Sequence, residues 1–110
     1  VRDNIHAIDV ARFIGCFIES PRTAEVYNLG GGYRNSISIL EAFKLIENIS
    51  GTTMRYNYDD VPREGDHKVY YSNLDKIMKD YPQWTITRNL QSIFEEVHNA
   101  WLIRSRKDHN

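Results

Sequence analysis

The segment SILEAFKLIENISG, residues 38–51, has the clearest start and end signals of the helices predicted in the sequence. Its apolar face needs to pack against another part of the fold. Ser38 and Glu41 have capping-box spacing, in which each side chain satisfies a backbone N–H of the other residue. Gly51 stands where many helices end in a left-handed residue. Between these ends, apolar residues recur on one helix face: Ile39, Phe43, Ile46 and Ile49. The segment is therefore predicted to be a helix with one face buried.

A second helix is predicted upstream, beginning near Asp9. Its apolar residues fall at the spacing of one helix face: Val10, Phe13, Ile14, Phe17 and Ile18. Pro21 ends this helix, because proline lacks the backbone donor and disfavours helical geometry in Ser20. The segment EVYNL, residues 25–29, is then predicted to be a short buried strand that leads into Gly30, Gly31 and Gly32.

Downstream of residue 51, the pattern predicts one more strand and a short helix. Apolar and polar residues alternate in MRYNYDD, residues 54–60, as expected for a half-buried strand. Asn73 is a candidate cap for a short helix, which Pro82 would end. The apolar residues of that helix are Leu74, Ile77, Met78 and Tyr81.

The last predicted helix follows WTIT, with Thr87 as its candidate cap. Its inward stripe comprises Leu90, Ile93, Phe94, Val97 and Trp101. The polar tail, residues 104–110, is expected to fray, and Trp84 and Trp101 are predicted to be structural packing residues. Helices alternate with strands that are too few for a large sheet. The predicted class is therefore α/β, or α+β under a stricter label, with a small sheet and about four helices.

Composition favours one globular domain over residues 1–110, because 41% of the 110 residues are hydrophobic and 26% are charged. Fourteen Lys and Arg against fifteen Asp and Glu give a net charge of −1, so no global field attracts nucleic acid or an anionic membrane. No apolar run approaches the about 20 residues of a membrane span. The lone Cys16 cannot form an internal disulfide, which fits a reducing compartment. These features predict a cytoplasmic location, with neither nucleic acid nor membrane as a partner.

Residues 61–68, VPREGDHK, place a cation and a carboxylate on either side of a glycine in a predicted loop. The Arg63 guanidinium is a planar fork of donors suited to phosphate oxygens. Gly65 permits close approach of the backbone to a ligand, and Asp66 has acceptors for sugar hydroxyls. The alternative is a solvated turn with a surface ion pair of small energetic value, and the loop by itself favours that alternative.

Arg2 is a second candidate cation, in the opening segment VRDNIH. Alternation along a strand places Arg2 and Asn4 on one side and Asp3 on the other. The alternative is an edge strand protected by its charges, which this segment alone favours. His6 is a candidate proton carrier, but a hydrogen-bonded structural role is the stronger interpretation.

The glycines at residues 30–32 are interpreted as a tight strand exit. They lack the G-x-G-x-x-G spacing of a dinucleotide site, and no Lys-Ser/Thr pair follows them. The four histidines, the cysteine and the acidic residues lack the spacing of zinc or calcium ligands. We therefore predict no metal site and no cofactor site in this chain.

Six segments in the same order resemble the extended short-chain dehydrogenase/reductase family, also called the NAD-dependent epimerase/dehydratase family. They are VRDNIHAIDVARF, EVYNLGGG, NSISILEAF, PREGDH, SNLDK and YPQW. The resemblance is to the C-terminal, substrate-binding part of these Rossmann-type proteins, and is greatest to nucleotide-sugar epimerases of the CDP-paratose 2-epimerase kind. It spans nearly the whole chain.

The resemblance implies that Arg2 and Arg63 bind the diphosphate of a CDP- or UDP-sugar and that Asp66 binds its ribose. Members of the family also carry a Rossmann domain with a glycine-rich NAD loop and a Tyr-x-x-x-Lys pair. This sequence contains neither motif. We therefore expect a fragment with no catalytic residue, whose full-length parent binds NAD and is an epimerase. Whether the chain alone is an enzyme stays open.

Two alternatives remain at this stage. A 4,6-dehydratase or reductase of the same family would share these segments, and a stand-alone module would bind nucleotide sugars or a protein partner without turnover. The expected partners are the sugar nucleotide and the missing Rossmann domain. We expect an exposed apolar face where that domain docks, and self-association of the isolated chain through it.

Overall fold

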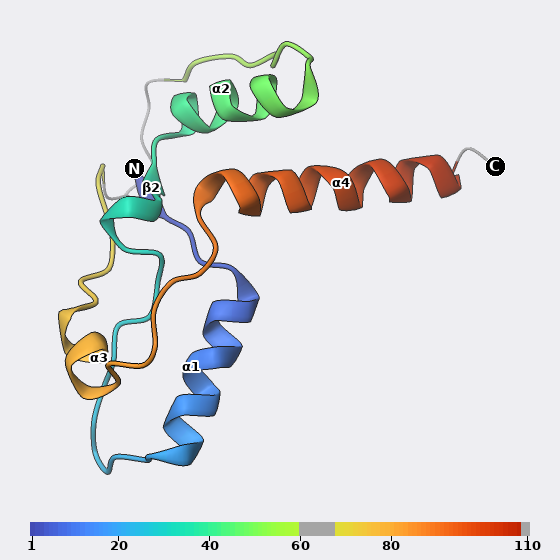
Figure 1. Ribbon diagram of the computed structural model, residues 1–110. Coiled ribbons are helices and arrows are strands. Elements are labelled where there is room, and N and C mark those ends of the chain that lie inside the picture. The colour runs from blue at the N-terminus through green and yellow to red at the C-terminus, as the bar shows by residue number, and fades with distance from the viewer. Residues whose placement is uncertain (60–67, 109–110) are drawn as a thin grey trace.

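A computed structural model describes the chain at residues 1–59 and 68–108 (Figure 1). In chain order the elements are β1 (Arg2–Asp3), α1 (Ala7–Glu19), the 3-10 turn η1 (Tyr33–Asn35), β2 (Ser36–Ile37), α2 (Ile39–Ser50), α3 (Asp75–Asp80) and α4 (Leu90–Asp108). The strands β1 and β2 pair antiparallel, with Arg2 opposite Ile37 and Asp3 opposite Ser36. Over the described residues the chain is thus a small α+β unit of one two-stranded sheet and four α-helices, which confirms the predicted class.

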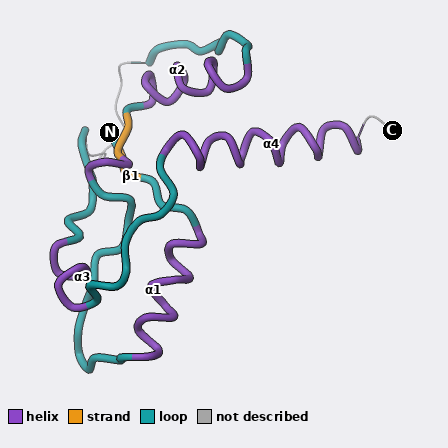
Figure 2. The backbone as a smooth tube through the Cα atoms, viewed as in Figure 1, coloured by secondary structure: helices purple, strands orange, loops and turns teal. Residues whose placement is uncertain are grey.

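The buried core lies between α1 and α3, at the end of the molecule away from α2 (Figure 2). Its centre is formed by Ile77, Tyr81 and Trp84, each about 1% exposed. Phe13 of α1 packs edge-on against the last two, with ring centroids 5.4 Å from Tyr81 and 5.9 Å from Trp84. Aromatic pairs of this geometry stabilise a fold beyond the area that they bury.

The predicted strand at residues 25–29 is wrong, because this segment is a loop. Its apolar side chains still meet the core, where Tyr27 and Leu29 pack against the buried cluster. The Tyr27 hydroxyl donates to Asp80 of α3 at 2.7 Å, and burial together with this carboxylate raises the pKa of Tyr27. The segment is therefore held by side chains and not by pairing with a neighbouring strand.

The predicted strand at residues 54–60 is wrong over its described part, since residues 54–59 form a loop and Asp60 lies outside the described residues. This loop runs back along α2 (Figure 1). Tyr56 packs on Phe43 of α2, with ring centroids 5.0 Å apart. Alternating residues can cover a helix face as well as a sheet, so the pattern alone did not decide between them.

The predicted helix ends are confirmed where local chemistry sets them. The helix α1 stops at Glu19, before Ser20 and Pro21. In the capping box of α2, Glu41 N–H donates to Ser38 Oγ and Ser38 N–H to Glu41 Oε1, both at 3.1 Å. Gly51 follows with φ 73°, the left-handed conformation predicted for it. The predicted Asn73 cap of α3 is wrong, because Leu74 occupies the N-cap position. Asn73, one residue earlier, accepts from the Asp75 N–H through Oδ1 at 2.9 Å.

Replacing Ser38 by alanine is expected to lower the free energy of unfolding by about 1 kcal/mol, because it removes the Oγ acceptor of the Glu41 N–H and leaves only the backbone N–H of residue 38 bonded to Glu41. Urea denaturation followed by circular dichroism would measure the change. Ser105→Ala is the matched control, since Ser105 is an exposed residue inside α4. Equal stability of the Ser38 variant and the wild type would contradict the prediction.

The last helix starts later and runs further than predicted. Asn89 caps α4, because its Oδ1 accepts from Ser92 N–H at 2.8 Å, so Thr87 is not the cap. The helix continues to Asp108 and projects from the rest of the molecule, where a frayed tail was predicted (Figure 1). Only its first half lies beside α2. Val97 and Trp101, predicted to point inward, are consequently 63% and 64% exposed.

The molecule is more open than a compact domain of its size. Its accessible surface is 8899 Å², against about 6,300 Å² for a compact monomer of this mass. Its radius of gyration is 17.2 Å, against about 13 Å for a compact chain of 110 residues. Apolar surface that a compact domain would bury is therefore exposed.

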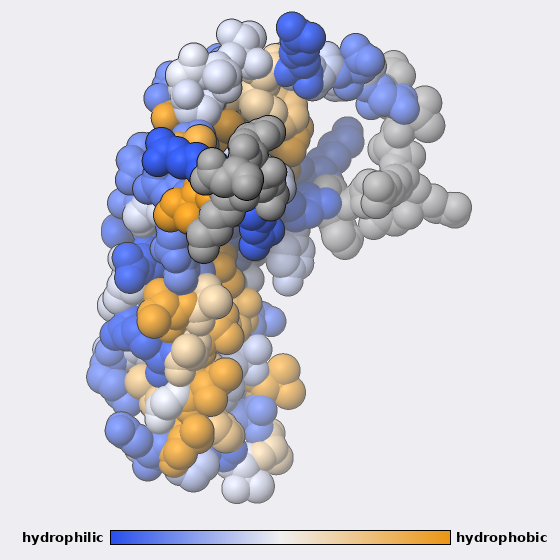
Figure 3. Space-filling view, turned by 90° about the vertical axis from the view of Figure 1, so that its right-hand side faces the viewer, coloured by the Kyte–Doolittle hydropathy of each residue, from blue (hydrophilic) through white to orange (hydrophobic). Residues whose placement is uncertain are grey.

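Part of this exposed apolar surface is the outer face of α1, defined by Ile8, Ile14 and Ile18. Phe13 and Phe17 face the core as predicted, but Ile14 and Ile18 of the same predicted stripe are 52% and 70% exposed. Figure 3 shows apolar side chains gathered over the part of the surface where α1 lies. A helix that is apolar on both sides is typical of the interior of a larger protein.

Candidate functional site

The strand β1 lies between two other backbone segments. On one side it pairs with β2, and on the other Arg2 bridges to Tyr70 in a parallel arrangement. The Tyr70 N–H donates to the Val1 carbonyl at 2.9 Å, and the Val1 nitrogen donates to the Lys68 carbonyl at 2.8 Å. The interpretation of β1 as a protected edge strand is therefore wrong.

The side chain of Arg2 is exposed on β1. Within the described part of the chain, its guanidinium donates one hydrogen bond, from Nη1 to the Val1 carbonyl at 2.9 Å. Arg2 and Tyr70 face each other across the bridge, so their side chains leave the same face, whereas Asp3 points to the opposite face. The predicted alternation of Arg2 and Asp3 is thus present.

The Asp3 carboxylate joins three segments that are distant in sequence. Its Oδ2 accepts from the N–H of Gly32 at 3.1 Å and from the N–H of Ser72 at 3.0 Å. Burial on its own would raise the pKa of Asp3. Hydrogen bonds from the Ser72 N–H, the Gly32 N–H and the Ser72 hydroxyl outweigh burial and lower this pKa. The carboxylate is therefore charged at neutral pH.

The glycine loop, residues 30–32, is packed against β1 and Ser72. It is not the predicted strand exit, because residues 25–29 form a loop. A side chain at Gly31 would overlap the Asn4 carbonyl, and one at Gly30 would overlap the Asp3 carboxylate and Ser72. These glycines allow close approach between protein segments. A carboxylate and a carbonyl at this position would also repel phosphate, so the loop does not have the character of a phosphate site.

His6 has the hydrogen-bonded structural role that we predicted for it. Its Nδ1 accepts from Ile8 N–H at 2.9 Å and so caps the start of α1. Its Nε2 lies 2.8 Å from Glu96 Oε2, which links α1 to α4. Both ring nitrogens are therefore engaged by residues of the fold.

Asp9 is a buried carboxylate whose importance the sequence did not reveal. The sequence indicated only a residue at the start of a helix. In the fold it is fully buried and accepts from the Thr87 hydroxyl at 2.6 Å and from the N–H groups of Thr87 and Arg88, each at 3.1 Å. Burial would raise the pKa of Asp9, but these bonds and one from Arg12 lower it. No local pattern could have linked residues so far apart.

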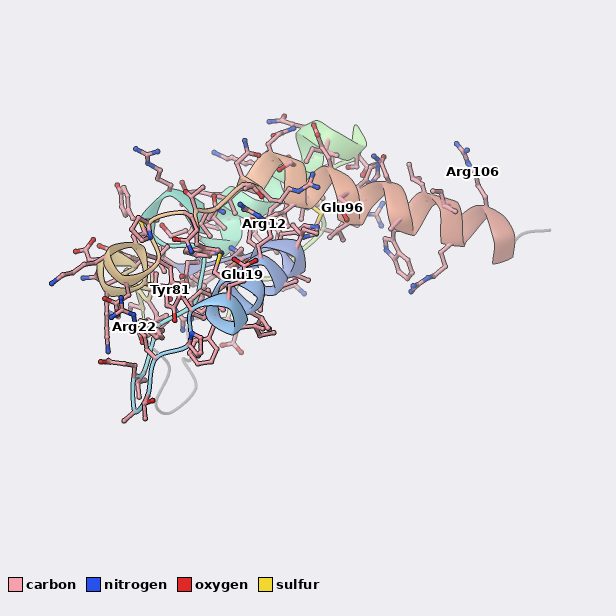
Figure 4. All side chains as sticks on the ribbon, turned by 60° about the horizontal axis from the view of Figure 1, so that its bottom comes forward. Arg12, Glu19, Arg22, Tyr81, Glu96 and Arg106 are labelled. Atoms are coloured by element: carbon pink, nitrogen blue, oxygen red, sulfur yellow. The ribbon has the colours of Figure 1, made fainter. Side chains whose placement is uncertain are left out.

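Figure 4 places Arg12 near the segment that leads into α4, and Arg106 on the projecting end of that helix. Arg12 donates to the Thr85 carbonyl at 3.1 Å and lies 3.5 Å from Asp9. Arg12 therefore supports the fold around Asp9, and Arg106 lies far from β1.

Of the three predicted substrate-binding residues, the structure places Arg2. Arg63 and Asp66, together with Gly65, lie outside the described residues. The described chain resumes at Lys68, directly beside β1. A recess of about 550 Å³ is lined by Met54, Arg55, Tyr56 and Asn57, which form one continuous stretch and include none of the predicted residues.

In residues 1–59 and 68–108, no group of three or more His, Cys, Asp or Glu side chains is arranged to hold a metal ion. None of the helices found there has the length and apolar character needed to cross a membrane.

Comparison with known proteins relates the chain to an epimerase. No family model matches it. The chain is similar to CDP-paratose 2-epimerase of Salmonella typhi, with 37% identity over 79 residues. These residues are 70% of this chain and 23% of that protein, so the chain spans less than a quarter of the length of this curated relative. The similarity thus supports a relationship to epimerases over this one part of the relative.

Proposed function

We propose that the chain is the substrate-binding part of an NAD-dependent nucleotide-sugar epimerase. Arg2 and Arg63 bind the diphosphate of the sugar nucleotide, and Asp66 binds the ribose. The observation that carries this proposal is the 37% identity to CDP-paratose 2-epimerase, a protein named for its action on a CDP-linked sugar.

The surroundings of Arg2 support its proposed role. Its backbone is fixed from both sides, by β2 and by Tyr70, while its side chain is exposed. A guanidinium on a rigid strand can form two parallel hydrogen bonds to phosphate oxygens without losing much freedom. The segment that begins at Lys68 lies beside β1. It directly follows the residues that contain Arg63 and Asp66, which is compatible with one shared site.

NAD does not fit the glycine loop, residues 30–32. The sequence lacks the glycine-rich dinucleotide motif, and the glycine loop is filled by Asp3, Asn4 and Ser72. The proposal therefore assigns to this chain the binding and orientation of the substrate. NAD and the catalytic residues belong to a Rossmann domain elsewhere in a longer protein. Fixing a sugar ring against a reacting group contributes several kcal/mol to catalysis.

The outer face of α1 supports the proposal that a Rossmann domain packs against this chain in a longer protein. Ile8, Ile14 and Ile18 expose apolar surface on a helix whose other face is already packed. The Rossmann domain covers this face in the longer protein. The isolated chain, with the face uncovered, self-associates at high concentration.

Arg2→Ala and Arg63→Ala are each expected to weaken binding of CDP-glucose by the full-length gene product about 30-fold, which corresponds to a charged hydrogen bond of about 2 kcal/mol. Isothermal titration calorimetry at low and high salt would measure this, and added salt should weaken wild-type binding. Arg106→Ala, on the projecting end of α4, is the control and should bind as the wild type does. Unchanged affinity in either test variant would refute the proposed site.

A further inference from the structure

We infer that Asp3 is a positioning residue of the proposed diphosphate site, because its carboxylate fixes the strand that carries Arg2 to the segment at residues 68–72. This inference rests on the proposed function. It adds a residue that contacts no ligand and acts through Arg2.

The segment at residues 68–72 is hydrogen-bonded to the start of the chain at every second residue: Lys68, Tyr70 and Ser72. The Lys68 carbonyl accepts from Val1, the Tyr70 N–H donates to Val1, and the Ser72 N–H donates to Asp3 at 3.0 Å. The first two bonds are made by the backbone of Val1 and would form with any side chain. The third depends on the Asp3 carboxylate, so it is the contact in this set that a substitution can remove.

The same carboxylate oxygen also accepts from the Gly32 N–H at 3.1 Å. Asp3 thus holds β1 against the glycine loop on one side and against Ser72 on the other. Gly30 leaves room for the carboxylate, since a side chain there would overlap it. Hydrogen bonds to an ionised acceptor are roughly twice as strong as neutral ones. Asparagine has the same shape but is neutral, so it would hold these segments less firmly.

The direction in which Asp3→Asn changes binding affinity distinguishes a positioning role of Asp3 from a direct effect of its charge. Asp3 is adjacent in sequence to Arg2, and a negative charge near a diphosphate opposes its binding. If Asp3 acted only through its charge, Asp3→Asn would strengthen binding. If Asp3 acts by orienting the strand, the same substitution weakens binding.

The test is a double-mutant cycle in the full-length gene product, with CDP-glucose as the probe and calorimetry as the measurement. Asp3→Asn is expected to weaken binding about tenfold, because a small displacement of a binding group has an effect of at least this size. In an Arg2→Ala background the same substitution is expected to change affinity less than about twofold, since its effect passes through Arg2. A residue that merely stabilises the fold would show equal effects in both backgrounds.

Two further variants keep the test decisive. Ser72→Ala removes the hydroxyl bond to Asp3 but keeps the backbone bond. It is expected to weaken binding about threefold, and it takes the place of Asp3→Asn in the cycle if that variant does not fold. Asp9→Asn alters another carboxylate that accepts backbone N–H groups, in a different part of the fold. It should lower the unfolding temperature while leaving the affinity of the folded protein unchanged.

The outcomes distinguish this inference from the proposed function. If Arg2→Ala weakens binding while Asp3→Asn leaves it unchanged or stronger, the positioning role is wrong and the proposed site stands. Equal effects of Asp3→Asn in both backgrounds also overturn the positioning role. If Arg2→Ala has no effect, the proposed site itself is wrong, and the role of Asp3 is lost with it.

Discussion

Replacing Trp84 by alanine is expected to lower the free energy of unfolding by about 4 kcal/mol, the range found for large aromatic residues in protein cores. Trp84 is 1% exposed and contacts the Phe13 ring at the centre of the core. Its Nε1 also donates to the Asp9 carbonyl at 2.9 Å. The substitution therefore leaves a cavity and removes the indole hydrogen bond to the Asp9 carbonyl.

Trp101→Ala provides the matched control, since it removes the same side chain from an exposed position on α4. Trp101 is 64% exposed and stacks on Arg104 at 5.6 Å, so its loss should change stability by less than about 1 kcal/mol in the isolated chain. Urea denaturation followed by far-ultraviolet circular dichroism avoids reliance on tryptophan fluorescence. Similar losses of unfolding free energy for the two variants would contradict the location of the core around Trp84.

Asp9→Ala is expected to lower the free energy of unfolding by about 3 kcal/mol, because it leaves several buried donors without an acceptor. The carboxylate accepts from the Thr87 hydroxyl and from the N–H groups of Thr87 and Arg88. These bonds attach the segment before α4 to the first turn of α1. Without them, α4 should lose its fixed position relative to the core.

Smaller variants around Asp9 test which bonds matter. Thr87→Val removes the 2.6 Å hydroxyl bond and should cost about 1.5 kcal/mol. Arg12→Ala should cost less than about 1 kcal/mol, because Arg12 is 41% exposed and lies 3.5 Å from the carboxylate. A larger loss for Arg12→Ala than for Thr87→Val would contradict this order. Thermal or urea unfolding at neutral pH would measure all three.

The pH dependence of stability gives an independent test of Asp9. Its pKa is lower in the folded state than in the unfolded chain. The stabilisation is therefore complete above the unfolded pKa, near 3.8, and is lost as the pH falls through the folded pKa. The difference in stability between wild type and Asp9→Asn should shrink below about pH 4. A constant difference at all acidic pH values would contradict an ionised Asp9.

The sequence by itself determined the helix ends that depend on neighbouring residues. Pro21 stops α1, the pair Ser38 and Glu41 starts α2, and Gly51 ends it, as predicted. These signals act over one helical turn, within which backbone groups and side chains meet whatever the rest of the chain does. Such signals located the four helices, whereas the strands predicted at residues 25–29 and 54–60 are not the strands that pair in the fold.

The tertiary structure decided which segments pair and which side chains are buried. Residues 25–29 and 54–59 have strand-like sequences but form loops, because a strand exists only where another backbone lies alongside it. The strand β1 has such neighbours on both sides, which fixes the backbone of Arg2. The carboxylates of Asp3 and Asp9 accept hydrogen bonds from residues about 30 to 80 positions away in the sequence. Contacts over such distances depend on how the whole chain folds, and no local spacing encodes them.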